Sequence, residues 1–368
     1  MTKARDIADL GAVTARLDTV GGSSGALSNR NLIINGGMTI SQRIGTTATA
    51  ITGGAYGLDR WGMYYDGNSY TTQQVTDAPA GFYNSMKLTV TGTTTPNYSF
   101  FGQRIEGLNV NHLGLGAANC QTFTVSFYVK SSVAGVYSIS MTNGASDLAY
   151  PVQYTINSAD TWERKTMTIP PITSGTWTKD NTNGLYLRIN LGSPSGRTDT
   201  SGAWSSGNFD GADGSTGAVT WATTSGATFY MTGCQIELGT EATPFDHRSF
   251  GDELLRCQRY CIDLTPTSGT SPYIGASAAA GNTTVAVAHI ALPVQMRATP
   301  SATLSGTAGN YTVFNGADRT CTSYAINGMS PLGGGINFTC SGGGLTANDA
   351  CGIYVANTNV RSIIEAEL

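Results

Sequence analysis

The 368-residue chain has few charged side chains. Asp, Glu, Lys and Arg make up 12% of it, with 20 cationic residues against 24 anionic ones. A typical globular domain carries about 25% charged residues. The low charge content excludes a charged, solvated tail. The near balance of cationic and anionic residues excludes a general nucleic-acid binder, which needs a basic surface. Because hydrophobic residues still make up 40% of the chain, it also excludes intrinsic disorder.

Long hydrophobic runs and simple metal motifs are missing as well. No run of 18 apolar residues occurs, so we expect neither a transmembrane helix nor membrane insertion. The first ten residues lack the apolar core of a signal peptide, so we expect synthesis in the cytoplasm without signal-directed export. The 7 cysteines include no CxxC pair, and the 3 histidines stand in no zinc motif. We therefore expect no metal and no cofactor.

Motifs of catalysis are also absent. The sequence contains no HExxH, no GxSxG and no phosphate-binding loop. It shows no internal repeat of the length that β-helical spikes use. We therefore predict that the protein is not an enzyme. Two carboxylates brought together from distant loops would suffice for glycoside hydrolysis, so a polysaccharide-degrading spike stays open as an alternative.

What the sequence has in excess is glycine, with 47 residues, and short β-type runs. From Asn31 onward, segments rich in Val, Ile, Thr, Tyr and Phe alternate with clusters of Gly, Asn, Asp and Ser, which is typical of an all-β sandwich or jelly roll. Within 122–130 the apolar residues occupy alternate positions, as in a half-buried antiparallel strand. The predicted strands are 31–35, 86–91, 122–130, 136–141, 164–169, 185–191 and 227–238.

Two short helices are predicted. In residues 3–20, four apolar residues recur with the 3-4-3 spacing of a coiled coil over barely two heptads, followed by a Gly/Ser linker at 21–25. Such a helix needs partner helices or a docking surface, and packing on its own domain is the alternative. Residues 249–261 form the second helix, with Asp252 and Glu253 in its first turn, where the helix dipole favours acids.

These boundaries predict four segments. Residues 1–30 form a helix and linker, 31–248 a jelly-roll β-sandwich, 249–261 a helical connector and 262–368 a smaller β-domain. The last segment has only 8 charged residues, which predicts a surface buried against copies of itself, most simply in a homotrimer. A monomeric domain kept in solution by Ser, Thr and Asn is the alternative.

Several ordered motifs resemble bacteriophage and prophage tail-fibre proteins. They are NLIINGGMTISQR (31–43), YGLDRW (56–61), FGQRIEG (101–107), FTVSFYVKS (123–131), ATFYMTGCQIELGTEATPFDHR (227–248), ELLRCQRYC (253–261), LPVQMRATPSATL (292–304) and the closing SIIEAEL. Residues 31–248 also resemble a carbohydrate-binding jelly roll. The resemblance implies a homotrimeric adhesin that sits on the virion tail and contacts host-surface glycans.

Candidate glycan-binding residues are aromatic side chains with polar neighbours, because sugars need a flat apolar face beside hydrogen-bonding groups. Trp177 is followed by Lys179, Asp180 and Asn181, and packing under a loop is its alternative role. The other candidates are Trp204, Tyr64, Tyr65, Tyr70, Asn208 and Asp210. Asn208 and Asp210, with Asp213, could instead offer oxygens to calcium, although their spacing matches no EF-hand. Trp61 and Trp162 are expected to pack in the core.

The leading hypothesis is a phage tail-fibre protein. Residues 1–30 are predicted to attach to tail or baseplate proteins, and the trimer to bind host surface polysaccharide through many weak contacts. Neither nucleic acid nor a membrane is an expected partner, and the expected location is the virion tail. The alternatives are a structural virion component without a receptor, such as a head fibre, decoration protein or tail adaptor, and the polysaccharide-degrading spike.

Overall fold

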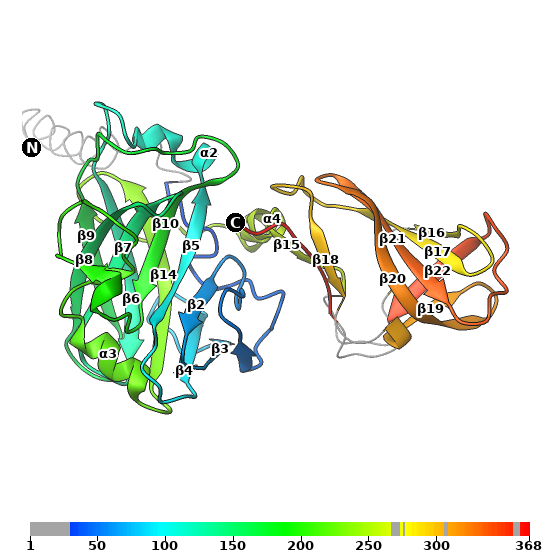
Figure 1. The fold of residues 1–368 in the computed structure, drawn as a ribbon, viewed down its shortest axis with the longest axis horizontal. Coiled ribbons are helices and arrows are strands. Elements are labelled where there is room, and N and C mark those ends of the chain that lie inside the picture. The colour runs from blue at the N-terminus through cyan, green and yellow to red at the C-terminus, as the bar shows by residue number, and fades with distance from the viewer. Residues whose placement is uncertain (1–29, 266–272, 275–276, 305–307, 356–360) are drawn as a thin grey trace, which may run out of the picture. The chain divides into compact units, whose positions relative to one another are not determined.

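The computed structural model describes residues 30–265, 273–274, 277–304, 308–355 and 361–368 (Figure 1). The predicted helix at 3–20 and the linker at 21–25 lie outside these residues. The chain divides into two compact units, Met1–Ser249 with Leu368 and Phe250–Glu367. Among the described helices, none has the length and apolar character needed to cross a membrane.

The first unit is a β-sandwich of two six-stranded sheets, which we call sheets A and B. In spatial order, sheet A contains β1 (Thr49–Ile51), β3 (Tyr70–Val75), β4 (Ser85–Val90), β14 (Thr228–Leu238), β6 (Phe123–Ser131) and β9 (Glu163–Ile169). Sheet B contains β12 (Ser205–Ser206), β8 (Leu148–Ile156), β7 (Gly135–Asn143), β10 (Asn183–Asn190), β5 (Tyr98–Glu106) and β2 (Gly62–Asp66). All strand pairs within the two sheets are antiparallel. The predicted all-β jelly-roll class is confirmed.

Short helices and strands lie in the loops that connect the strands of this sandwich. α2 (Gly107–Val110) and the 3-10 helix η1 (Asn111–Leu113) follow β5. The Gly- and Ser-rich stretch at 192–220 folds into the 3-10 helix η2 (Ser195–Arg197), the parallel pair β11 (Thr198–Asp199) and β13 (Gly211–Ala212), the edge strand β12, and most of α3 (Thr216–Thr223). This stretch is therefore an ordered connecting segment with secondary structure of its own.

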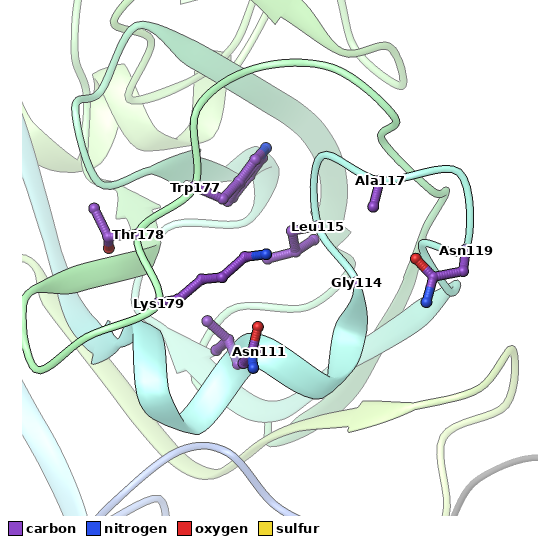
Figure 2. Close-up of a pocket in the computed structure, with 9 residues that line it drawn as sticks. Asn111, Gly114, Leu115, Ala117, Asn119, Trp177, Thr178 and Lys179 are labelled. Atoms are coloured by element: carbon purple, nitrogen blue, oxygen red, sulfur yellow. The ribbon is translucent and has the colours of Figure 1, made fainter.

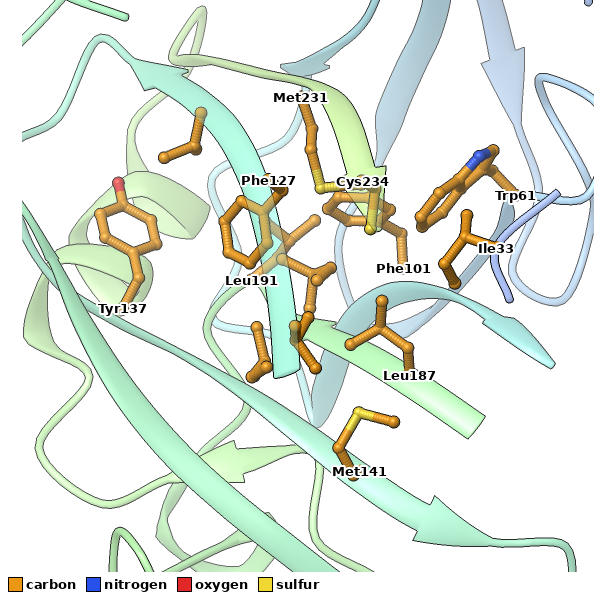
Figure 3. Packing of buried hydrophobic residues seen from close by; sticks show 14 of the residues in the cluster. Ile33, Trp61, Phe101, Phe127, Tyr137, Met141, Leu187, Leu191, Met231 and Cys234 are labelled. Carbon is orange, nitrogen blue, oxygen red and sulfur yellow. The ribbon is translucent and has the colours of Figure 1, made fainter. Parts of the chain in front are cut away.

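The core lies between the sheets and is built by alternation (Figure 3). Phe123, Val125, Phe127 and Val129 of β6 all have no exposed surface, as the period of two predicts. Trp61 is 1% exposed and donates its indole N–H to the backbone oxygen of Asn35. Burial of each such side chain contributes roughly 1.5–3 kcal/mol, so this layer is the main source of the sandwich's stability.

One predicted strand is wrong. Residues 31–35 form no ladder, because their backbone groups bond mostly to side chains. The Asn31 carboxamide donates to the Cys234 backbone oxygen at 3.0 Å and accepts from the backbone N–H groups of Ile33 and Ile236. The Ile34 N–H donates to Gln103 Oε1 at 2.8 Å. Apolar residues here follow a strand-like pattern, but buried amide side chains take the place of a neighbouring strand.

The second unit begins with α4 (Phe250–Gln258), which has Asp252 and Glu253 in its first turn as predicted. It ends before residue 261, because Cys261 already starts β15 (Cys261–Asp263), which joins β23 (Ser362–Glu365) and β18 (Ser301–Leu304) in a small sheet. Six further strands form an antiparallel sheet that closes on itself, in the order β16 (Ser277–Ala280), β17 (Val285–Ala291), β21 (Gly333–Cys340), β20 (Asp318–Ser330), β19 (Tyr311–Phe314) and β22 (Ala350–Val355). The 3-10 helix η3 (Ala308–Asn310) precedes β19.

Candidate functional site

A pocket of about 170 Å³ opens at one end of the sandwich, between the segment that follows β5 and the loop that precedes β10 (Figure 2). Its lining residues are Val110, Asn111, Gly114, Leu115, Ala117, Asn119, Trp177, Thr178 and Lys179. Val110, Leu115 and Trp177 are buried and give the pocket an apolar floor. The pocket is smaller than the roughly 300 Å³ at which sites for drug-sized ligands begin, so it suits a single ring or the end of a chain.

The Trp177 ring is held rigidly. Its indole N–H donates to the backbone oxygen of Ser174 at 3.0 Å, and its ring forms a T-shaped contact with the Trp204 ring at a centroid distance of 5.9 Å and an interplanar angle of 89°. Gly116 packs so closely that a Cβ there would lie 2.6 Å from Trp177 Cδ1, and its φ of +80° is one that a residue with a side chain rarely adopts. The close approach and the backbone conformation both require glycine at position 116.

The polar rim of the pocket is not engaged by the protein itself. Asn111, Asn119 and Lys179 are exposed, and within the part of the chain that the structure describes their side chains make no hydrogen bond and no ion pair. In Figure 2 the Lys179 side chain extends across the pocket toward Leu115. By contrast, the Thr178 hydroxyl donates to the backbone oxygen of Asn183 at 2.7 Å and thereby fixes the loop.

This arrangement combines an apolar floor with two carboxamides and one ammonium group that remain available. A pyranose ring offers C–H groups on one face and hydroxyls at its edge, and these match an apolar floor and a polar rim respectively. Trp177 and Lys179, which the sequence predicts to act together, both line this pocket. Asp180 stays outside the lining, and its carboxylate accepts from the N–H and hydroxyl of Thr182. Those hydrogen bonds lower the pKa of Asp180.

Trp204 lies behind Trp177 rather than on the pocket surface. Its indole N–H donates to the backbone oxygen of Pro170 at 3.0 Å, and its ring lies 5.4 Å from that of Tyr150. The half-buried Trp204 ring packs against Trp177 and does not line the pocket. Its contribution to the pocket is to position Trp177.

The three candidate tyrosines lie on other parts of the sandwich. Tyr70 is 1% exposed, stacks on Trp221 at 5.6 Å and shares a hydrogen bond with Ser99, so it is a core residue and not a sugar platform. Burial raises the pKa of its hydroxyl. Tyr65 donates to the backbone oxygen of Ile51, and Tyr64 stacks on Phe100 beneath the Arg104 guanidinium. Both of these hydroxyls and rings are engaged within the protein.

Asn208 and Asp210 hold the 192–220 segment in place against sheet B. Asp210 has no exposed surface, so it is not available to a glycan. Its carboxylate accepts from Arg188 Nη1 at 3.0 Å, from two nitrogens of Arg197 at 2.9 Å each, and from the Ser193 hydroxyl at 2.9 Å. Asn208 Oδ1 also accepts from Arg188, at 2.6 Å. Because guanidinium groups occupy the place where calcium would bind, this oxygen cluster is a structural anchor.

Asn111 and Asn119 line the pocket without any local sequence pattern that marks them. Their segment lies about 60 residues before Trp177 and reaches the pocket only because α2 packs on the 178–182 loop, through Gly107 N–H to Thr182 O and Leu108 N–H to Asp180 O, both at 2.9 Å. The one local hint is Gly114, which caps η1 with a φ of +67° and turns the chain back over the pocket.

No protein-family model and no curated protein matches the chain. Parts of several solved structures are similar to it. The enzymatically active domain of tailspike protein 4 from bacteriophage CBA120 is 13% identical with a TM-score of 0.33, over 57% of this chain but only 22% of that one. A CBM4 structure is 15% identical with a TM-score of 0.29, over 54% of this chain and 100% of that one.

The CBM22-1 xylan-binding domain of Xyn10C from Paenibacillus barcinonensis is 13% identical with a TM-score of 0.29, over 59% of this chain and 100% of that domain. The class of the protein rests on its own two sheets and their shared core rather than on these likenesses. It is an all-β protein whose larger unit is a jelly-roll sandwich.

Proposed function

We propose that the protein is a glycan-binding protein and that the Trp177 pocket is its saccharide site. One observation carries this proposal. The pocket joins a rigid apolar floor to three polar side chains, Asn111, Asn119 and Lys179, that have no partner among the described residues. Polar groups at the mouth of an apolar pocket that are free of internal hydrogen bonds are suited to a ligand that carries many hydroxyls.

Binding in this site combines two weak effects. The C–H face of a sugar ring covers Leu115 and the edge of Trp177, which removes apolar surface from water. The carboxamides of Asn111 and Asn119 accept from and donate to ring hydroxyls, and the Lys179 ammonium donates to a further oxygen. A pocket of this size holds about one ring, so single-site affinity is low, and useful avidity needs several copies of the chain.

We further propose that this glycan binder is a bacteriophage tail fibre. In this proposal residues 1–30 attach the chain to the virion tail, three copies assemble, and the pockets engage host surface polysaccharide without catalysis. The ordered motifs between residues 31 and 368 and the charge-poor segment after residue 261 support it. Sedimentation or light scattering of the full chain tests the trimer, and a monomer mass at every concentration rejects it.

Equilibrium binding to a panel of neutral bacterial-surface oligosaccharides tests the saccharide site. We expect at least one oligosaccharide to bind, and we expect Lys179→Ala and Asn119→Ala to weaken it because both residues are exposed rim donors. The matched control is Tyr83→Ala, since Tyr83 is 76% exposed and does not line the pocket. Binding that survives both rim substitutions, or no binding at all, contradicts the proposal. Release of reducing ends during binding would instead identify the degrading spike.

A further inference from the structure

A row of side chains crosses the outer face of sheet A, away from the pocket. Gln73 on β3 lies opposite Lys87 on β4, Lys87 opposite Tyr230 on β14, and Tyr230 opposite Lys130 on β6. The next pair along β6 and β9 is Val129 with Glu163, so Trp162, just before β9, continues the row beside Lys130. These positions alternate with core residues such as Met86, Leu88, Val129, Phe229 and Met231, so the row faces away from the core.

Trp162 is not the core residue that its sequence context predicts. Its ring is half-buried, and its indole N–H donates to Asp77 Oδ1 at 3.1 Å. Its ring forms a T-shaped contact with the Tyr230 ring at a centroid distance of 6.2 Å. A tryptophan that a hydrogen bond already fixes on the outer sheet face loses little conformational entropy when a ligand covers it.

The row also carries cations in excess. Lys130 Nζ lies 4.3 Å from the Tyr230 ring centre and 5.4 Å from that of Trp162, and it forms an ion pair with Asp77. Lys87 Nζ lies 5.7 Å from the Tyr230 ring centre. Among the residues that the structure describes, Lys87 has no carboxylate oxygen within ion-pair distance. Asp77 interacts electrostatically with Lys87 as well as with Lys130, so two ammonium groups on this face share one carboxylate.

We propose that this row, Lys87, Tyr230, Lys130 and Trp162, is a second saccharide-binding surface and that it takes acidic saccharides. The rings supply faces for sugar C–H groups, and Lys87 supplies the cation for a carboxylate, as in a uronic or sialic acid. From Trp162 to Lys87 the row spans three strand intervals, about 14 Å, which suits a short stretch of an extended polysaccharide. This surface is separate from the Trp177 pocket, so an experiment can reject saccharide binding at one of the two sites without rejecting it at the other.

The test is equilibrium binding of the full chain to polygalacturonate, hyaluronate and polysialate, with dextran as the neutral polymer. We expect at least one acidic polymer to bind at low ionic strength and to bind more weakly at about 0.5 M salt, because exposed charges are screened. Lys87→Gln should weaken that binding about two- to five-fold, the range for one exposed ion pair. Trp162→Ala should weaken it at least about five-fold, as expected of an aromatic anchor.

Two lysine controls distinguish this surface from a general effect of net charge and from the Trp177 pocket. Lys165→Gln removes the same charge from β9, but Lys165 is paired with Glu163, so we expect no loss of binding. Lys179→Gln tests the pocket and should leave the acidic polymers unaffected. If no acidic polymer binds more tightly than dextran, or if Lys87→Gln and Lys165→Gln behave alike, the proposal is overturned. Lys87→Gln is a conservative change on a half-buried residue, so the test does not depend on how well Trp162→Ala folds.

Discussion

Replacing Asp210 by alanine should destabilise the sandwich more than any loss of an exposed ion pair. The carboxylate has no exposed surface and accepts four hydrogen bonds, from Arg188, Arg197 and Ser193. The Arg188 side chain is only 4% exposed, so removal of Asp210 leaves a buried guanidinium without its counter-charge. Breaking a buried pair in this way costs about 3–5 kcal/mol, whereas an exposed pair contributes about 0–1 kcal/mol.

Urea denaturation followed by tryptophan fluorescence measures this cost in the right part of the molecule. All 5 tryptophans lie before residue 249 and thus in the first unit, so the signal reports on the sandwich. With a urea m-value of about 3 kcal/mol/M, a loss of about 3–5 kcal/mol lowers the midpoint by about 1–2 M.

A double variant isolates the buried charge as the cause. Replacing Arg188 by methionine and Asp210 by leucine removes the two buried charges and keeps comparable apolar volume, which is often nearly neutral for buried pairs. Arg197, the other guanidinium bound to Asp210, keeps its charge, but its side chain is 29% exposed and stays accessible to water. We expect the double variant to be more stable than Asp210→Ala alone. The role of the buried charge is refuted if Asp210→Ala lowers stability by less than about 1 kcal/mol. It is also refuted if the double variant loses as much stability as the single variants Arg188→Met and Asp210→Leu lose when their losses are added.

Cysteine reactivity, glycine packing and acid stability provide three further tests of the structure. A thiol reagent should label Cys120 and Cys351, which are partly exposed, well before the five buried cysteines; equal labelling of all seven in native protein would contradict the packing. Gly102→Ala should lower the urea midpoint, because a Cβ there lies 2.0 Å from the Leu187 backbone oxygen, while Gly196→Ala, which meets nothing within 4 Å, should not. Burial opposes ionisation of Asp77, but hydrogen bonds from the neighbouring lysine and tryptophan outweigh it and lower its pKa below the ordinary 3.8. The stabilisation that ionised Asp77 provides is therefore present above about pH 3.8 and is lost as the pH falls below the folded-state pKa of Asp77. In an acid titration of stability, Asp77→Asn should remove this part of the pH dependence.

Much of the sandwich follows from sequence because its strands obey a local rule. In 122–130 the apolar side chains alternate without a break, and a strand places all of them on one face. The structure also buries Thr124 and Ser126 on the opposite face, which the prediction of a half-buried strand does not include. The same rule wrongly predicts a strand at 31–35. There the decisive bonds come from the carboxamides of Asn31 and Gln103, and nothing near either residue in the sequence indicates that they meet.

The site was predictable only in part, for a similar reason. Trp177 and Lys179 are neighbours in sequence, so their pairing could be predicted. Asn111 and Asn119 reach the pocket through tertiary packing of α2, which no local pattern encodes. Trp162 shows the converse error, because an aromatic residue beside a strand suggests core, whereas its bond to Asp77 holds it on the surface.

The most direct measurement of the central claim is the set of indole N–H signals in an NMR titration with the neutral oligosaccharide that binds best in the panel. The 5 tryptophans give five signals, which single substitutions assign. We predict that the Trp177 signal shifts most, while those of the fully buried Trp221 and the surface residue Trp162 stay unchanged. Saturating binding that leaves the Trp177 signal in place would contradict the claim that this pocket is the saccharide site.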